Sequence, residues 1–143
     1  PGAVILYKPH PDVEAALRPG AVAALDLAGL ADHVASGADP AALIDAVDEV
    51  WTLTSQLGFE ALLRGKPVTC LGAPFYAGWG LTVDVPSHPR RTRRLSLDEL
   101  VAGALIVYPT YVSQTTGAFT TPERALVELT QWQRTAPQAE PAP

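Results

Sequence analysis

The feature that most constrains this chain is a strand, a turn, a helix and a second strand that follow one another with short connections. The run EVWTL at residues 49–53 predicts a buried strand, and residues 56–64 place apolar side chains at helical spacing. Gly65 and Lys66-Pro67 end that helix, and residues 68–71 predict the next strand. Strands joined through a helix pair in parallel. We therefore predict an α/β fold, a Rossmann-like three-layer domain with a parallel sheet.

The same alternation continues towards both ends of the chain. Asp39-Pro40 is an N-cap followed by proline at the first helical position, and Ser96 with Glu99 forms a capping box. Pro19-Gly20 divides the segment after the first strand into two short pieces, of which the first is compatible with a helix. The expected strands lie at residues 3–7 and 32–35, and the expected helices at 41–47, 97–107 and from 121 to about 134.

Length and hydrophobic content indicate one domain. A chain of 143 residues, 48% of them hydrophobic, is long enough for one buried core and too short for two. We expect this domain over residues 1–134, and a disordered tail rich in Ala, Pro and Gln over residues 135–143. The chain has no methionine, and its first apolar run begins at residue 3, which favours a piece of a longer protein.

Charge and hydropathy argue against several classes of function. A net charge of -5 does not favour general attraction to nucleic acid or anionic lipid, so any anion site must be local. No apolar run reaches the roughly 18 residues of a membrane span, and no signal peptide opens the chain. The single cysteine, Cys70, fits a reducing cytoplasm. The spacing predicts neither a metal site nor a cofactor, since no ligand cluster or Gly-rich phosphate loop is present.

Hydroxyl and carboxylate side chains follow the strand at residues 49–53, where open α/β sheets bind ligands. Thr54 and Ser55 precede a helix whose first N–H groups are unpaired, which predicts a phosphate site; the alternative is that they only cap the helix. Glu60 lies five residues beyond Ser55 and is able to accept hydrogen bonds from a ribose diol. Its alternative role is an ion pair with Arg64, four residues further on.

A second candidate lies in the loop after the first strand. His10 is held between Pro9 and Pro11, which restrict the backbone, and Lys8 adds a cation beside it. A lone histidine is more often structural, but a histidine braced by two prolines at a strand end is less so. The loop is therefore the other place where we expect contacts to an anion.

The segment at residues 72–94, GAPFYAGWGLTVDVPSHPRRTRR, is too long for an ordinary connection and is typical of a functional loop. Its aromatic residues argue against disorder. Four arginines near its end are suited to a carboxylate or phosphate, or form a solvated surface instead; they are Arg90, Arg91, Arg93 and Arg94.

Three segments carry a family resemblance: YKPHPDV at residues 7–13, VDEVWTLTSQLGFEALLRGKPVTCLGAPFYAGWGLTVD at 47–84, and RRLSLDELVAGALIVYPTYV at 93–112. They resemble the capsule polysaccharide biosynthesis family, the KpsC-type β-Kdo transferases, over about residues 3–130. PFYAGWG and the LSLDELV to YP run are specific to that family, whereas the HP and GFEALLRGKPV patterns are shared more widely among GT-B transferases.

The resemblance implies a GT-B enzyme whose C-terminal, Rossmann-like half binds CMP-Kdo. His10-Pro11 and Thr54-Ser55 match the motifs that contact the nucleotide phosphate in related CMP-sugar transferases. Glu60 matches a ribose-binding carboxylate, and Lys8 the basic residue before the His-Pro motif. By hypothesis the loop with Tyr76 and Trp79 covers the donor or faces the acceptor, and an arginine among residues 90–94 binds the Kdo carboxylate.

The implied partners are CMP-Kdo, a lipid-linked or oligosaccharide acceptor, and an N-terminal GT-B domain of the same parent chain, with no nucleic acid. The expected location is the cytoplasm, including the inner face of the membrane. The sequence pattern indicates no nucleophile or base, and nothing supports Asp12 or Asp84 in that role. We therefore expect the catalytic carboxylate to lie in the N-terminal domain, and we expect no sugar transfer by this chain alone. The alternatives are a transferase for another nucleotide sugar, and a non-catalytic module for capsule export or polysaccharide binding.

Overall fold

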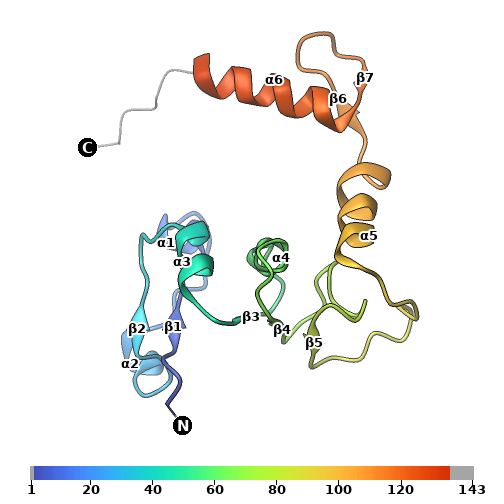
Figure 1. The fold of residues 1–143 in the computed structure, drawn as a ribbon. Helices are drawn as coiled ribbons and strands as arrows, with labels where there is room; N and C mark the ends of the chain where they lie inside the picture. The colour runs from blue at the N-terminus through green and yellow to red at the C-terminus, as the bar shows by residue number, and fades with distance from the viewer. Residues whose placement is uncertain (1, 136–143) are drawn as a thin grey trace.

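The computed structural model describes residues 2–135, and Figure 1 shows short strands with helices beside them. The helices are α1 (Pro11–Glu14), α2 (Ala24–Leu27), α3 (Pro40–Ala46), α4 (Leu57–Leu63), α5 (Leu97–Ala102) and α6 (Pro122–Thr135). A π-helical segment, Gly103–Val107, continues α5. The strands are β1 (Leu6–Tyr7), β2 (His33–Val34), β3 (Val50–Thr52), β4 (Val68–Cys70), β5 (Val83–Asp84), β6 (Tyr111–Val112) and β7 (Phe119–Thr120).

The strands pair into three small sheets. β1 is parallel to β2, and β3, β4 and β5 form a parallel sheet with β4 in the centre. β6 and β7 form an antiparallel hairpin. The predicted α/β class with parallel strands is confirmed. The expectation of one continuous parallel sheet is wrong, because within residues 2–135 no pairing joins the β1–β2 pair to β3, and strands of two residues offer few backbone partners.

The buried core lies where α4 packs on β3 and β4. Phe59 and Ala61 of α4 face Val68 and Cys70 of β4, and all four side chains are almost fully buried. The burial of Cys70 raises the pKa of its thiol, so it behaves as a small apolar side chain. This core fixes the position of the turn between β3 and α4, where the sequence predicts a ligand.

Two helix starts are confirmed by their caps. The Asp39 carboxylate accepts a hydrogen bond from the Ala42 N–H at 3.0 Å. At α5, Ser96 Oγ accepts from the Glu99 N–H at 3.2 Å, and the Glu99 carboxylate accepts from the Ser96 N–H at 2.7 Å. These contacts are local in sequence, and this explains why the residue pattern predicts them.

The region after α5 extends away from the parallel sheets, and Figure 1 shows α6 joined to them through the β6–β7 hairpin. Glu128 of α6 fixes the hairpin, since its carboxylate accepts from Ser113 Oγ and the Gln114 N–H, both at 2.8 Å. Arg124 Nε donates to the same carboxylate at 3.0 Å. Large apolar side chains here are exposed, among them Val107, Tyr108, Phe119, Leu126, Leu129 and Trp132.

Several sequence-based expectations differ from the structure. The strand expected at residues 3–7 contains only Leu6–Tyr7, and neither of these side chains is fully buried. The helix expected over residues 97–107 ends as an α-helix at Ala102 and continues with π geometry. β5 and the β6–β7 hairpin were not expected. The start of α6 is confirmed. Thr135, the first residue of the tail predicted over residues 135–143, is the last residue of α6, and residues 136–143 lie outside the described residues.

Candidate functional site

His10 follows β1 and caps the short helix α1, of which Pro11 is the first residue. Its Nδ1 accepts a hydrogen bond from the Asp12 N–H at 3.1 Å. Because Nδ1 accepts, the neutral imidazole carries its proton on Nε2. Within residues 2–135 that Nε2–H has no hydrogen-bond partner, and the side chain is 40% exposed. His10 is therefore a cap that still presents a donor to a ligand.

Lys8 is engaged by the fold. Its ammonium pairs with the Glu14 carboxylate of α1, which also accepts from the Gly37 N–H at 2.8 Å. The Lys8 ammonium and the Gly37 N–H hold the pKa of Glu14 below its usual value. The Lys8–Glu14 pair thus links the end of β1 to α1 and to the loop after β2, and the contact from Lys8 to a phosphate stays a prediction.

The Thr54-Ser55 turn lies between β3 and α4. Ser55 Oγ accepts from the Leu57 N–H at 3.2 Å, although the N-cap of α4 is Gln56, so Ser55 lies one residue before the cap position that we considered for it. A capping hydroxyl keeps its own proton and is able to donate it at the same time. The Thr54 side chain is exposed and makes no hydrogen bond within the described part of the chain. Since α4 has only seven residues, the hydroxyls matter more here than the helix dipole.

Glu60 lies in the first turn of α4 and is half-buried. The ion pair with Arg64 that we considered from the spacing is not formed. Arg64 Nη1 donates to the backbone carbonyl of Glu60 at 3.2 Å, and its Nε lies 3.3 Å from Asp45 Oδ1. Among residues 2–135 the Glu60 carboxylate has no ion-pair or hydrogen-bond partner, and it is therefore available to a ligand.

Tyr76, which we predicted as a substrate contact, has a fully buried side chain in this structure. It packs edge-on to Phe75, with ring centroids 5.2 Å apart, and its hydroxyl donates to the carbonyl oxygen of Ser55 at 2.5 Å. The aromatic run PFY gives no indication of which ring turns inward, and therefore the sequence pattern alone did not separate Tyr76 from its neighbours.

Arg91 binds backbone carbonyls of the aromatic loop, the name that we use for residues 72–94. Its Nη1 donates to the carbonyl oxygens of Pro74 at 2.6 Å and Ala77 at 2.5 Å. Its guanidinium lies 5.5 Å from the centre of the Trp79 ring, a cation–π contact. Trp79 in turn donates from Nε1 to the Phe75 carbonyl at 2.8 Å. Arg91 thus has contacts within the protein, and its predicted role as a ligand for a carboxylate or phosphate stays a prediction.

The other three arginines differ from Arg91. The Arg94 guanidinium lies against Gly80, where an added Cβ would be 3.0 Å from its Cζ, so Arg94 covers the loop backbone. Arg90 and Arg93 are exposed and form no ion pair within the described residues. Arg94 is exposed as well, and all three stay candidates for binding an anionic substrate.

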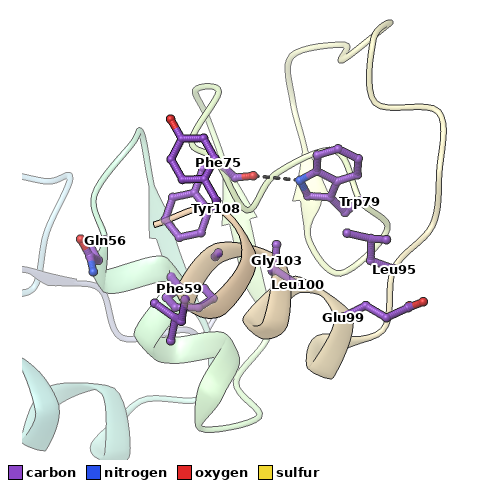
Figure 2. Close-up of a pocket in the computed structure, with 11 residues that line it drawn as sticks. Gln56, Phe59, Phe75, Trp79, Leu95, Glu99, Leu100, Gly103 and Tyr108 are labelled. Atoms are coloured by element: carbon purple, nitrogen blue, oxygen red, sulfur yellow. Dashed lines mark hydrogen bonds between the residues drawn. The ribbon is translucent and has the colours of Figure 1, made fainter. Parts of the chain in front are cut away.

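A mostly apolar cavity of about 530 Å³ lies beside the Thr54-Ser55 turn, between α4, the aromatic loop and α5 with its π-helical continuation. Figure 2 shows the side chains that line it, including Gln56, Phe59, Phe75, Trp79, Leu100 and Tyr108. Glu99 lies at its edge, but the capping bond from the Ser96 N–H engages its carboxylate and lowers its pKa. The cavity is suited to an apolar or planar group, and Trp79 is the predicted substrate-binding residue that faces it.

The two strand ends that carry the candidate phosphate-binding residues lie in separate sheets. His10 follows β1 of the first sheet, and Thr54-Ser55 follows β3 of the second. No hydrogen bond or ion pair within residues 2–135 links the two, so their convergence on one phosphate stays a prediction. In the same part of the chain, no group of three or more His, Cys, Asp or Glu side chains is arranged for a metal ion, and no helix is long and apolar enough to cross a membrane.

The sequence analysis did not predict the roles of Asp84 and Gly58, which shape the aromatic loop and its contact with the Thr54-Ser55 turn. Asp84 ends β5 and accepts from the Gly78 N–H at 2.8 Å and from Thr82 Oγ1 at 2.7 Å, which anchors the aromatic loop. Gly58 leaves the space in α4 that the Tyr76 hydroxyl enters. A glycine inside an otherwise apolar helix was the available signal for such a close approach. Asp84 had no comparable signal, because its partners depend on the fold of the loop.

Comparison with known proteins places the chain in a family. Residues 1–120 match the family described as capsule polysaccharide biosynthesis protein. Capsule polysaccharide modification protein LipA of Neisseria meningitidis serogroup A is 55% identical over 112 residues, which is 78% of this chain and 16% of that protein. Lipopolysaccharide-processing protein LpsZ of Rhizobium meliloti is 47% identical over 129 residues, which is 90% of this chain and 29% of that protein.

Two solved structures share the fold. The KpsC β Kdo 2,7 transferase of Thermosulfurimonas dismutans superposes with a TM-score of 0.79 at 47% identity, covering 92% of this chain and 41% of that one. The KpsC β Kdo 2,4 transferase of the same organism gives a TM-score of 0.80 at 39% identity, covering 90% and 40%. The chain thus spans less than half of each relative.

Proposed function

Because the chain belongs to the capsule polysaccharide biosynthesis protein family, we propose that it is the donor-binding part of a β-Kdo transferase. In this proposal the chain is the C-terminal half of a two-domain GT-B enzyme, the donor is CMP-Kdo, and the acceptor is lipid-linked or an oligosaccharide. The observation that carries the proposal is the similarity in sequence and fold to the two Kdo transferases over most of this chain.

The proposed phosphate contacts come from three neutral donors. His10 Nε2–H, the Thr54 hydroxyl and the Ser55 hydroxyl all keep a proton that no described residue accepts. Hydrogen bonds from such groups to phosphate oxygens stabilise the charge that the leaving nucleotide gains as its bond to the sugar breaks. This role requires no charge on the protein, which is consistent with the acidic composition.

Other groups would hold the rest of the donor. The free carboxylate of Glu60 is suited to accept from the ribose hydroxyls, and the Kdo carboxylate is suited to Arg90 or Arg93. The Asp84 carboxylate is already bonded on both oxygens, and the Asp12 carboxylate lies beside the His10 cap. We therefore place the attacking group in another domain of the parent protein, and expect this chain to bind nucleotide without transferring sugar.

Substitution of the proposed donors tests this site. His10→Ala or Ser55→Ala should weaken CMP binding by about 1–3 kcal/mol, the loss expected when a hydrogen bond to a charged group is removed. Thr130→Ala is the matched control, because it removes a hydroxyl from α6 that bonds only the Leu126 carbonyl. Titration calorimetry on the three variants measures the difference. CMP affinity that is the same in both site variants as in the control would rule out the proposed contacts.

A further inference from the structure

The Tyr76 hydroxyl contacts the Thr54-Ser55 turn from a different part of the chain. Tyr76 comes from the aromatic loop, 21 residues after Ser55, yet its Oη donates to the Ser55 carbonyl at 2.5 Å. The Tyr76 side chain has no exposed surface. A buried tyrosine usually directs its hydroxyl to a partner, and here that partner is the residue whose side chain we place on the donor phosphate.

The turn is held by further bonds around Ser55. The Ser55 N–H donates to Thr52 Oγ1 at 3.2 Å, and the Ser55 carbonyl also accepts from the Gly58 N–H at 3.2 Å. With the bond from Leu57 N–H to Oγ, only the hydroxyl proton of Ser55 lacks a partner. Among these hydrogen bonds, only the one from Tyr76 comes from outside the β3–α4 segment, so within residues 2–135 it is the hydrogen bond that ties Ser55 to another part of the chain.

Gly58 makes room for this contact. A Cβ at position 58 would lie 2.3 Å from Tyr76 Oη and 3.0 Å from Thr52 Cγ2, so any larger residue forces the phenol away from Ser55. Burial raises the pKa of Tyr76 to about 12, so its hydroxyl remains a neutral donor at physiological pH. Space, burial and protonation therefore all favour the same hydrogen bond.

We propose that Tyr76 is a positioning residue for the donor-phosphate site, which it serves by fixing the Thr54-Ser55 turn without touching the ligand. This inference rests on the proposed function, since it assumes that the turn binds the nucleotide. It also assigns a role to the aromatic loop. Arg91 holds the backbone around Tyr76 through the Pro74 and Ala77 carbonyls, and the loop in turn orders the hydroxyls that bind phosphate.

The test compares two tyrosine-to-phenylalanine changes in the 143-residue chain. Tyr76→Phe removes the bond to Ser55, and the control Tyr111→Phe removes an equivalent bond to a backbone carbonyl, that of Leu105 at 2.6 Å. The first readout is amide hydrogen exchange without ligand. We expect Tyr76→Phe to speed exchange at Ser55 and Gly58 roughly tenfold, and Tyr111→Phe to leave these amides unchanged.

The second readout is the affinity for CMP, measured well below the unfolding temperature. Tyr76→Phe should weaken CMP binding roughly 3- to 10-fold, and Tyr111→Phe should not. A tyrosine with only a structural role would lower the unfolding temperature and leave CMP affinity of the folded protein unchanged. Unchanged affinity in Tyr76→Phe, together with weaker binding in Ser55→Ala, would overturn the inference and leave the proposed function standing. Unchanged affinity in both variants would rule out the Ser55 contact and with it the inference, whereas no CMP binding by the unsubstituted chain would overturn the proposed function.

Discussion

His10 and Ser55 show that capping and ligand binding are not exclusive roles for one side chain. His10 Nδ1 and Ser55 Oγ each accept a backbone N–H, and each side chain retains one proton to donate. A sequence shows a Ser or His before a helix but not which of its atoms is already used. The two candidate roles were therefore indistinguishable from the pattern. The structure makes His10 the cap of α1 and places Ser55 one residue before the N-cap of α4, and ligand binding by either side chain stays a prediction.

Substitution of Gly58 tests how closely α4 packs against Tyr76 beside the Thr54-Ser55 turn. Gly58→Ala should destabilise the chain by about 1–3 kcal/mol, because the added methyl group overlaps the Tyr76 hydroxyl. Gly103→Ala is the control, since a Cβ there meets nothing within 4 Å. Chemical denaturation measures both variants. Equal stability of Gly58→Ala and the wild-type chain would contradict the close contact between α4 and Tyr76.

At the scale of elements, local signals were predictable and long-range pairings were not. The caps at Asp39 and Ser96 were predictable because donor and acceptor lie three residues apart. β5 was not predicted, because a strand of two residues is too short to show a periodic apolar pattern. Its residues form a strand only through their pairing with β4. The predicted helix over residues 97–107 was correct in location, but the apolar pattern does not indicate that its geometry changes to a π-helix at Gly103.

The attachment of α6 to the β6–β7 hairpin should depend on pH. The bond from Ser113, followed by that from Arg124, holds the pKa of the Glu128 carboxylate below its usual value of 4.5. A carboxyl with a lowered pKa in the folded state stabilises it above about pH 4.5, and this contribution is lost as the pH falls through the lowered value. We expect the Gln114 N–H, which bonds to Glu128, to lose exchange protection in that range.

Glu128→Gln separates this effect from the titration of other carboxyl groups. The variant should protect the Gln114 amide less at pH 7 and lack the loss of protection below pH 4.5, because glutamine does not titrate. Amide exchange measured from pH 7 to pH 3 gives both profiles. Parallel profiles for the variant and the wild-type chain would show that Glu128 does not anchor the hairpin.

At the scale of the whole molecule, the structure combines a compact parallel core with a large exposed apolar surface. Tyr108 is 89% and Phe119 is 83% exposed, and both lie in the region that leads to α6. The chain also spans less than half of the two Kdo transferases that it matches. Sequence patterns predicted the parallel α/β core, but not which apolar side chains stay exposed, because burial depends on what packs against them.

The central claim is that this chain binds a cytidine nucleotide through His10 and the Thr54-Ser55 turn. Calorimetric titration of the 143-residue chain with CMP, UDP and GMP tests it most directly, with a capsular polysaccharide as a fourth ligand. We expect CMP to bind most tightly and His10→Ala to weaken CMP binding. Tighter binding of UDP, or binding of the polysaccharide with no response to any nucleotide, would contradict it.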